Sequence, residues 1–174
     1  GRIMDSFITD NYADGGITHP YGGTGDGIGG GIVMTSGELI NTVVARNWTH
    51  GEGGGVYMTG GRMNHCTVAF NSTRLTNSAG LFLSGGAVSN SIIYSNTRYC
   101  DNVHVNIRQI GGTLAYSCSW PLQPGIGNIA AEPDWANPAA NDFTLLPGSP
   151  CIDAAAAIPD IVADAAGNSR SQDG

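Results

Sequence analysis

The chain has 174 residues, a formal net charge of -7, 27 glycines and not a single lysine. This length suits one domain or part of a longer one, and a hydrophobic content of 41% argues against a wholly disordered chain. The negative charge disfavours a nucleic-acid partner, and the sequence has no apolar stretch long enough to span a bilayer.

A nine-residue pattern recurs along the first half of the chain. Each copy starts with an aliphatic residue or Met, has an aliphatic residue at its sixth place and ends in Asn. The copies are IMDSFITDN, LINTVVARN, MNHCTVAFN and VSNSIIYSN, with a fainter copy from Leu114. A second pattern of small residues followed by apolar ones precedes three of them: GGIVM from Gly30, GGVYM from Gly54 and AGLFL from Ala79, with NVHV from Asn102 as a degenerate fourth copy.

Together the two patterns form a unit of about 24 residues: strand, glycine turn, strand, Asn turn and polar loop. Such units, with short strands and no helical periodicity, are typical of a parallel β-solenoid. We therefore predict an all-β fold, a right-handed parallel β-helix of about five turns over residues 1–128. The first turn is expected to be incomplete and to carry a loop insertion at about residues 17–29. Residues 129–174 are expected to form an irregular segment that packs on the β-helix or caps it.

The Asn residues that end the repeats predict a structural ladder along one corner of the coil. Its members are Asn11, Asn47, Asn71 and Asn96. Asn tolerates left-handed turn geometry, and its side-chain amide can bond backbone groups of its own and adjacent turns. Asn47 and Asn71 also begin the glycosylation sequons NWT and NST, but their place in the repeat favours the structural role.

The repeats resemble those of right-handed parallel β-helix proteins of bacterial surfaces, including polymorphic outer-membrane proteins, in which GGAI-like and FxxN-like motifs recur. The stretches DFTLLPGSPCIDA from Asp142 and DAAGNSR from Asp164 are similar to the C-terminal segment of secreted β-helix proteins with a choice-of-anchor architecture. The resemblance implies a pectate-lyase-like solenoid, a secreted or cell-surface location and a chain that is part of a longer β-helix. It implies no single activity.

Related β-helices include polysaccharide lyases and glycoside hydrolases, whose chemistry needs clustered carboxylates, often with calcium and a basic residue. The repeated strands carry no such cluster, so we assign no catalytic residue; His65 with Asp5 or Arg62 is the alternative considered and not preferred. We expect a non-catalytic structural or adhesive segment of a secreted or cell-surface bacterial protein, in contact with polysaccharide. The competing prediction is a fragment of a lyase or hydrolase that acts on acidic, plant or algal polysaccharide.

An outward-facing column of side chains is the candidate site for glycan binding. If the aliphatic residues beside them point inward, Val33, Tyr57, Phe82 and His104 share one face of the coil. Aromatic rings stacked in this way can bind sugar rings, so Tyr57, Phe82 and His104 are the candidates. The competing interpretation, which we favour, is that the segment from Ile129 to Ile158 covers them, because large apolar patches seldom stay exposed.

Calcium is the one cofactor that the sequence suggests. Asp10, Asp14 and Asp26 form a weak candidate site, but an EF-hand-like spacing is broken where Tyr12 and Tyr21 stand. The four cysteines, Cys66, Cys100, Cys118 and Cys151, lack metal-ligand spacing, and the pattern leaves open whether they are buried thiols or include one disulfide.

Overall fold

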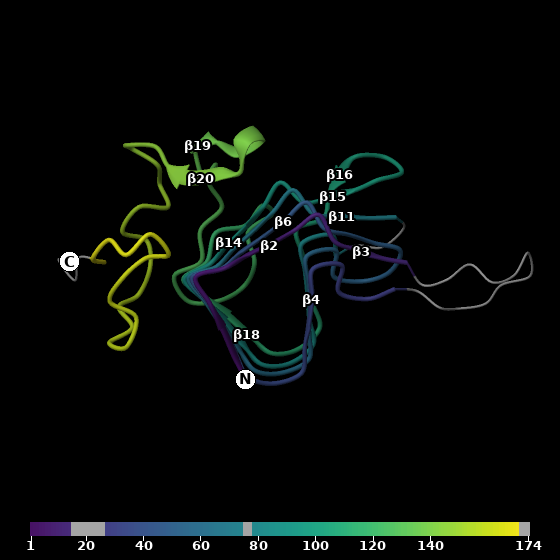
Figure 1. Ribbon diagram of the computed structural model, residues 1–174, viewed down its shortest axis with the longest axis horizontal. Helices are drawn as coiled ribbons and strands as arrows, with labels where there is room; N and C mark the ends of the chain where they lie inside the picture. Colours follow the sequence, from purple (N-terminus) through teal and green to yellow (C-terminus); the bar gives the residue numbers. More distant parts are fainter. Residues whose placement is uncertain (15–26, 75–77, 171–174) are drawn as a thin grey trace, which may run out of the picture.

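The protein is a parallel β-solenoid (Figure 1). The structure is a computed structural model that describes residues 1–14, 27–74 and 78–170. In these ranges there is no α-helix, and each turn of the coil adds one short strand to each of four sheets, named A to D in the order in which the chain visits them. The predicted all-β solenoid fold is thus confirmed.

Sheet A contains β1 (Arg2–Met4), β5 (Glu38–Ile40), β9 (Arg62–Asn64), β13 (Ala87–Ser89) and β18 (Thr113–Ala115). Sheet B contains β2 (Phe7–Thr9), β6 (Val43–Ala45), β10 (Thr67–Ala69) and β14 (Ile92–Tyr94). Sheet C contains β3 (Tyr12–Ala13), β7 (Trp48–Thr49), β11 (Ser72–Thr73) and β15 (Thr97–Arg98), with β16 (Val103–His104) added antiparallel to β15. Sheet D contains β4 (Ile32–Met34), β8 (Val56–Met58), β12 (Leu81–Leu83) and β17 (Ile107–Gln109).

The coil makes about three regular turns, fewer than the five expected. These are β5 to β8, β9 to β12 and β13 to β17. The first turn is interrupted between β3 and β4, where most of the expected insertion at 17–29 lies outside the described residues. In the last turn β18 of sheet A is the one strand that continues the stack in the described residues, and Cys118 adds a single parallel bridge to Ile92 of sheet B before the chain leaves the repeat.

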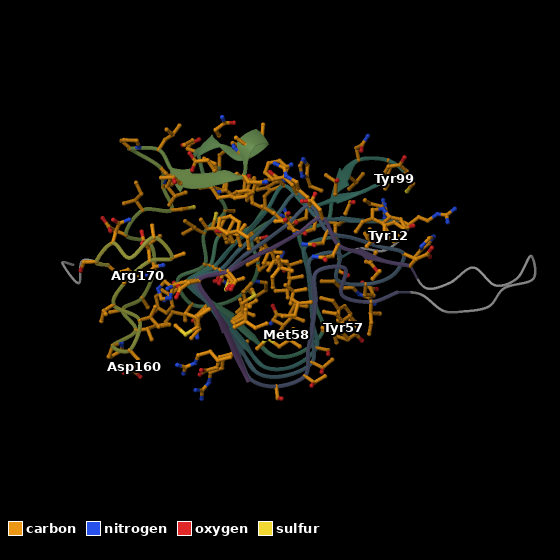
Figure 2. All side chains as sticks on the ribbon, viewed as in Figure 1. Tyr12, Tyr57, Met58, Tyr99, Asp160 and Arg170 are labelled. Carbon is orange, nitrogen blue, oxygen red and sulfur yellow. The ribbon has the colours of Figure 1, made fainter. Side chains whose placement is uncertain are left out.

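The pairing register confirms the alignment of the repeats. Two columns run through the coil, Ile3–Leu39–Met63–Val88–Leu114 in sheet A and Ile8–Val44–Val68–Ile93 in sheet B. Successive side chains of a strand point to opposite faces, so stacking equal positions lines one face with apolar groups. From Leu39 and Val44 onward, these side chains meet Met58, Leu81 and Leu83 of sheet D in a core that is almost fully buried, whereas Ile3 of the first strand is 40% exposed. Figure 2 shows Met58 inside the coil.

The predicted Asn ladder is a continuous chain of side-chain hydrogen bonds. The Nδ2 group of Asn11 donates to Asn47 Oδ1 at 2.9 Å, that of Asn47 to Asn71 Oδ1 at 3.0 Å, and that of Asn71 to Asn96 Oδ1 at 2.9 Å. Backbone N–H groups donate to the same oxygens at 2.9–3.0 Å. A fifth member that the repeat did not predict, Asn106, accepts from Asn96 Nδ2 at 3.0 Å and ends the ladder.

One part of the expectation for the ladder is wrong. The left-handed backbone belongs to the residue before each ladder Asn, and not to the Asn itself: Asp10, Arg46, Phe70 and Ser95, with φ between 54° and 59°. A second left-handed column breaks each nine-residue copy into two strands: Asp5, Asn41, His65, Asn90 and Tyr116. The Asn amides therefore bind the corner from inside the coil, and the sharp turn itself falls one residue earlier.

The small residues ahead of sheet D are required by close approach to the ladder. A Cβ atom on Gly55 would lie 2.7 Å from Asn71 Nδ2 and 2.9 Å from the carbonyl oxygen of Gly80. Both distances are well inside van der Waals contact, so only glycine fits there without displacing the ladder. The second glycine of each motif is therefore explained by the Asn column, whereas the first, as at Gly54, lies against backbone carbonyl oxygens.

The C-terminal segment packs on sheet B. Its hairpin consists of β19 (Trp135–Asn137), a 3-10 turn (Pro138–Ala140) and β20 (Asp142–Leu145), and Figure 1 shows it beside β6 and β14. The ring centroids of Trp135 and Phe143 lie 5.7 and 6.2 Å from that of Phe70. Arg46 Nε donates to Asn141 Oδ1 at 2.8 Å. The expectation that residues 129–158 cover the aromatic column of sheet D is therefore wrong.

Candidate functional site

An aromatic groove lies on the outer surface of sheet C. The register pairs Tyr12 with Trp48, and Trp48 with Ser72. A second column follows immediately after the strands end, where His50, Arg74 and Tyr99 continue the same backbone ladder. Five side chains line a cavity of about 380 Å³, which we name the sheet C groove: Tyr12, Trp48, His50, Arg74 and Tyr99.

The aromatic members of the groove present both a ring stack and free ring surface. Tyr12 and Trp48 are stacked face to face, with centroids 4.2 Å apart and planes 2° from parallel. His50 meets Trp48 edge-on at 4.6 Å. Tyr12 is 61% exposed and Tyr99 71% exposed, and Figure 2 shows both at the corner of the coil away from the C-terminal segment. Exposed aromatic rings beside polar donors are a feature of ligand sites rather than of a plain surface.

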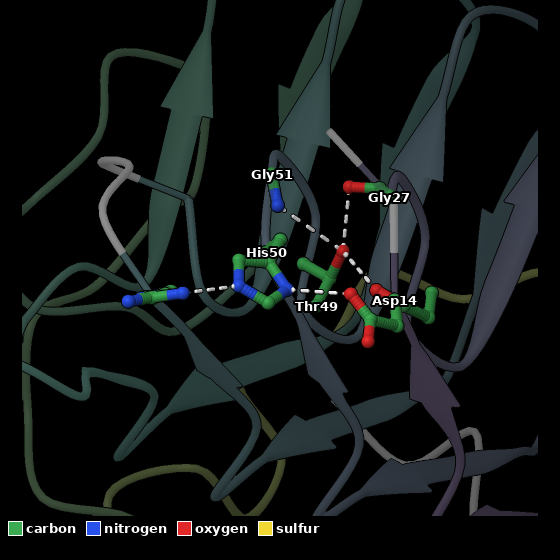
Figure 3. A network of polar contacts seen from close by, with 7 residues as sticks. Asp14, Gly27, Thr49, His50 and Gly51 are labelled. Atoms are coloured by element: carbon green, nitrogen blue, oxygen red, sulfur yellow. Dashed lines mark hydrogen bonds and ion pairs between the residues drawn. The ribbon is translucent and has the colours of Figure 1, made fainter. Parts of the chain in front are cut away.

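His50 joins the two charged neighbours of the groove (Figure 3). Its Nε2 atom lies 2.6 Å from Arg74 Nη1, and its Nδ1 atom lies 3.0 Å from Asp14 Oδ1. A guanidinium can only donate, so Nε2 must accept with its lone pair. The proton of the neutral ring then sits on Nδ1, the nitrogen nearest the Asp14 carboxylate. The lone pair that a general base would need is thus engaged by Arg74.

Buried threonines of sheet C hold the turn from which His50 projects. Thr49 is fully buried, and its hydroxyl donates to the carbonyl oxygen of Gly27 at 2.6 Å while the Gly51 N–H donates to Thr49 Oγ1 at 3.3 Å (Figure 3). One coil later, the Thr73 hydroxyl donates to the Gly51 carbonyl oxygen at 2.7 Å. These hydrogen bonds pair backbone N–H and carbonyl groups where the chain leaves the sheet, and so they fix the backbone that carries the groove residues.

The predicted aromatic pair of sheet D is present, but neighbouring side chains cover most of Phe82. Tyr57 and Phe82 are adjacent in the register and stacked, with ring centroids 4.7 Å apart and planes 9° from parallel. Phe82 is only 6% exposed. The Arg108 guanidinium lies over its ring at 5.7 Å and also forms an ion pair with Glu52. The candidate glycan residue Tyr57 is thus half-buried, and Phe82 presents little surface to a ligand.

The placement of His104 in this column is wrong. Phe82 pairs with Arg108, which puts β17 in the fourth place of sheet D. The NVHV stretch instead forms β16, an antiparallel strand beside β15 in sheet C, where His104 pairs with Thr97. The apolar NVHV stretch lies four residues too early for the column, and Arg108, which occupies the place in sheet D, lacks the apolar character of the pattern.

Two of the three candidate calcium ligands lie in the described part of the chain. Asp14 contacts His50, and Asp10 occupies a left-handed corner with φ 59°. Asp26 lies outside the described residues. Within the described ranges, no group of three or more His, Cys, Asp or Glu side chains is arranged to hold a metal ion.

A second cavity of about 570 Å³ separates the C-terminal segment from the coil. His65 lies on its wall, where burial, aided by the nearby Arg170, lowers the pKa of the imidazole to about 4. Arg170 Nη2 donates to Asn41 Oδ1 at 2.9 Å, and burial lowers the pKa of its guanidinium. Asn90 bonds both the N–H and the carbonyl of Ala156. The polar groups of this cavity fasten the C-terminal segment to the coil.

The alternative catalytic pairing of His65 with Asp5 is also not formed. The two residues belong to one left-handed column, but Asn41 of the intervening coil lies between them, since sheet A runs in the order β1, β5, β9. The His65 ring instead lies beside the Asn90 amide and near the Arg170 guanidinium, two groups that hold the C-terminal segment.

Comparison of the chain with protein-family models, with curated proteins and with solved structures finds no match. Among the described residues, no helix has the length and apolar character needed to cross a membrane. The sheet C groove is thus interpreted from its own geometry.

Only Asp14 of this region was singled out from the sequence, and then as a calcium ligand. The signal was present, because the groove residues stand one and three places after successive ladder Asn residues. Aligning the residues that follow Asn11, Asn47, Asn71 and Asn96 brings together the sets Tyr12, Trp48, Ser72, Thr97 and Asp14, His50, Arg74, Tyr99. The strands that carry them are two residues long, too short to show an alternating pattern.

Proposed function

We propose that the chain is a non-catalytic, adhesive β-solenoid segment of a secreted or cell-surface bacterial protein, and that the sheet C groove binds polysaccharide. The observation that carries the proposal is the stack of exposed Tyr12 on half-buried Trp48, beside His50 and Arg74. An aromatic face packs against the apolar face of a sugar ring, while imidazole and guanidinium groups bond its hydroxyls. A cavity of about 380 Å³ lies in the usual range for small-ligand sites.

The groove also suits an extended chain of sugars. Stacked strands repeat at about 4.8 Å, so Tyr12, Trp48 and Tyr99 belong to different coils and spread along the axis of the solenoid. A polymer lying along that axis would contact several coils at once. The engagement of His50 Nε2 by Arg74 favours binding over catalysis, because a base with an occupied lone pair cannot accept a substrate proton.

The test is retention of the purified chain on a panel of neutral and acidic plant, algal and bacterial polysaccharides, followed by calorimetry with soluble fragments. Trp48→Ala should weaken the binding by roughly 1.5 kcal/mol, since it removes one aromatic contact, or about tenfold in Kd. Tyr99→Ala should weaken it with little effect on folding, because Tyr99 is mostly exposed.

The matched control is Tyr57→Ala, a change in the half-buried aromatic column of sheet D. It should leave the affinity unchanged. If instead Tyr57→Ala abolishes binding and Trp48→Ala does not, the glycan lies on sheet D. A chain that retains no polysaccharide of the panel contradicts the proposal altogether.

A second candidate function, cleavage of an acidic polysaccharide, rests on the same trio of side chains. A substrate carboxylate that drew Arg74 away from His50 would free Nε2 as a base, with Asp14 on the opposite nitrogen. Release of reducing ends or of unsaturated products by the wild-type chain, lost in His50→Ala, would favour this enzyme over the adhesive segment.

A further inference from the structure

The C-terminal segment meets the end of the coil at a pair of cysteines. Cys118 is 3% exposed and is fixed on both sides, because its backbone bridges Ile92 of the preceding coil and Ile129 of the following segment. Its N–H donates to the Ser91 carbonyl oxygen at 2.9 Å. The thiol donates to the Ala131 carbonyl oxygen at 3.1 Å. The Cys118 sulfur is therefore held in one position.

Cys151 reaches this sulfur from the tight turn at Ser149–Cys151. Its N–H donates to Ser149 Oγ at 3.2 Å, and the buried Ser149 hydroxyl donates to the Pro133 carbonyl oxygen at 2.6 Å. The Cys151 thiol is hydrogen-bonded to Cys118, and both residues line the 570 Å³ cavity. Two positions 33 residues apart in the sequence are thus in side-chain contact.

The other two cysteines are placed differently. Cys66 is 1% exposed inside the coil, where its thiol contacts the carbonyl oxygens of Leu39 and Asn64. Cys100 is exposed on the β15–β16 hairpin. In the described part of the chain no metal-binding cluster includes a cysteine, so the chemistry open to Cys118 and Cys151 is that of two neighbouring thiols.

The contact also prepares one sulfur for reaction. The hydrogen bond from Cys151 lowers the pKa of the Cys118 thiol to about 7, against the opposing effect of burial. The same bond, together with burial, raises the pKa of Cys151. Exposure decides the order of the two thiols: Cys118 is buried and Cys151 is half-buried, so an oxidant reaches Cys151 first and Cys118 resolves the mixed disulfide.

We propose that Cys118 and Cys151 form an intrachain disulfide that fastens the C-terminal segment to the end of the solenoid, with a small-molecule disulfide as the oxidant. Cys151 attacks the oxidant, loses its proton, forms a mixed disulfide and releases one thiol. Cys118 then loses its proton, attacks the Cys151 sulfur, forms the intrachain S–S bond and expels the second sulfur of the oxidant, which takes up a proton and leaves as a thiol. The two protein thiols are oxidised, one disulfide is reduced to two thiols, and the atoms and electrons balance. This inference does not depend on the proposed function.

The experiment uses the full chain as Cys100→Ser, which removes the exposed thiol and its intermolecular products. After incubation with oxidised or reduced glutathione, the chain is unfolded in denaturant and alkylated without reduction. One alkylated thiol, Cys66, is expected after oxidation, against three in the reduced sample. Three alkylated thiols after oxidation, or glutathione retained on Cys151 without an internal bond, would overturn the proposal.

Peptide mapping identifies the bond. Trypsin leaves both cysteines in the peptide from Gln109 to Arg170, because no Arg or Lys lies between those ends. A second protease that cuts before Asp134 and Asp142 then separates Cys118 from Cys151. The two fragments should stay together until a reductant is added, and Cys118→Ser and Cys151→Ser should each abolish the link. A bond from Cys66 to either residue, or fragments that separate before reduction, would contradict it.

Discussion

The side-chain amide of Asn71 donates to Asn96 Oδ1 at 2.9 Å and accepts from Asn47 Nδ2 at 3.0 Å, so one buried residue links three coils. It also donates to the Val44 carbonyl oxygen at 2.9 Å. Inside the coil, where water does not reach, each polar atom of this amide has a hydrogen-bond partner. The ladder amides also bond backbone groups at the corner, which have no partner within the sheets. The ladder is therefore a structural element in its own right, comparable to the strands it connects.

Asn71→Ala should lower stability much more than Asn11→Ala. The first change removes the acceptor of the buried Asn47 backbone N–H and of one Asn47 Nδ2 bond, together with the donor to the Val44 carbonyl. Each buried group left unmet costs about 1–3 kcal/mol. Asn11 is exposed and lies at the open end of the ladder, and the backbone N–H of residue 11 still serves Asn47 Oδ1 after the substitution. Urea midpoints of the two variants measure the difference. Equal midpoints would mean that the ladder carries no stability.

Gly55→Ala should destabilise the fold by roughly 1–3 kcal/mol through overpacking. Its Cβ would press on Asn71 Nδ2 and on the Gly80 carbonyl, and neither group can retreat without breaking the ladder. Gly148→Ala is the control: a Cβ there meets open space, and only its φ of 92° makes the change unfavourable. Thermal unfolding should rank Gly55→Ala well below Gly148→Ala. The reverse order would show that backbone conformation, and not the ladder, demands glycine.

The features that could be predicted from the sequence are those that repeat. Leu39, Met63 and Val88 fall in one column because the coil places equal positions one strand apart, and sequence spacing reports this directly. His104 was misplaced because the NVHV stretch of the β15–β16 hairpin resembles the apolar strand pattern, whereas Arg108, which takes the place beside Phe82, does not.

The sheet C groove escaped prediction for a related reason. Trp48, His50 and Arg74 differ in chemistry at equivalent places, so they look like variable loop residues rather than a column. Their closeness follows from stacking of two-residue strands, which have no pattern of their own. The docking of Trp135 on Phe70 likewise depends on tertiary contact, since the C-terminal segment has left the repeat.

Trp135→Ala should release the C-terminal segment while the coil stays folded. The Trp135 ring meets Phe70, Tyr94 and Phe143 at centroid distances of 5.5–6.4 Å, and such ring pairs contribute about 0.5–1.5 kcal/mol each. The expected result is faster proteolytic cleavage before Asp142, while the circular dichroism spectrum of the β-solenoid stays unchanged. Tyr57→Ala, on the sheet that the segment does not touch, should leave the rate at the wild-type value; faster cleavage in that variant instead would place the segment on sheet D.

The docking of the C-terminal segment should also weaken in mild acid. Burial, with Arg170 nearby, lowers the pKa of His65 from 6.5 to about 4. The imidazole Nε2 accepts from Asn90 Nδ2 at 3.1 Å, which requires the neutral ring. Between these two pKa values the unfolded chain binds a proton that the folded chain does not, so stability falls as pH drops from 6.5 towards 4 and does not depend on this group above that window.

His65→Asn isolates this effect. The residue has φ 54°, and Asn occupies the equivalent left-handed positions 41 and 90, so the backbone should accept the change. The urea midpoint of the wild type should decrease between about pH 7 and about pH 5, whereas that of His65→Asn should decrease less. His104→Asn, on the β15–β16 hairpin, serves as the matched control and should keep the wild-type slope. If His65→Asn also keeps that slope, the buried His65 imidazole does not couple pH to the docking of the C-terminal segment, and the acid sensitivity belongs to other groups.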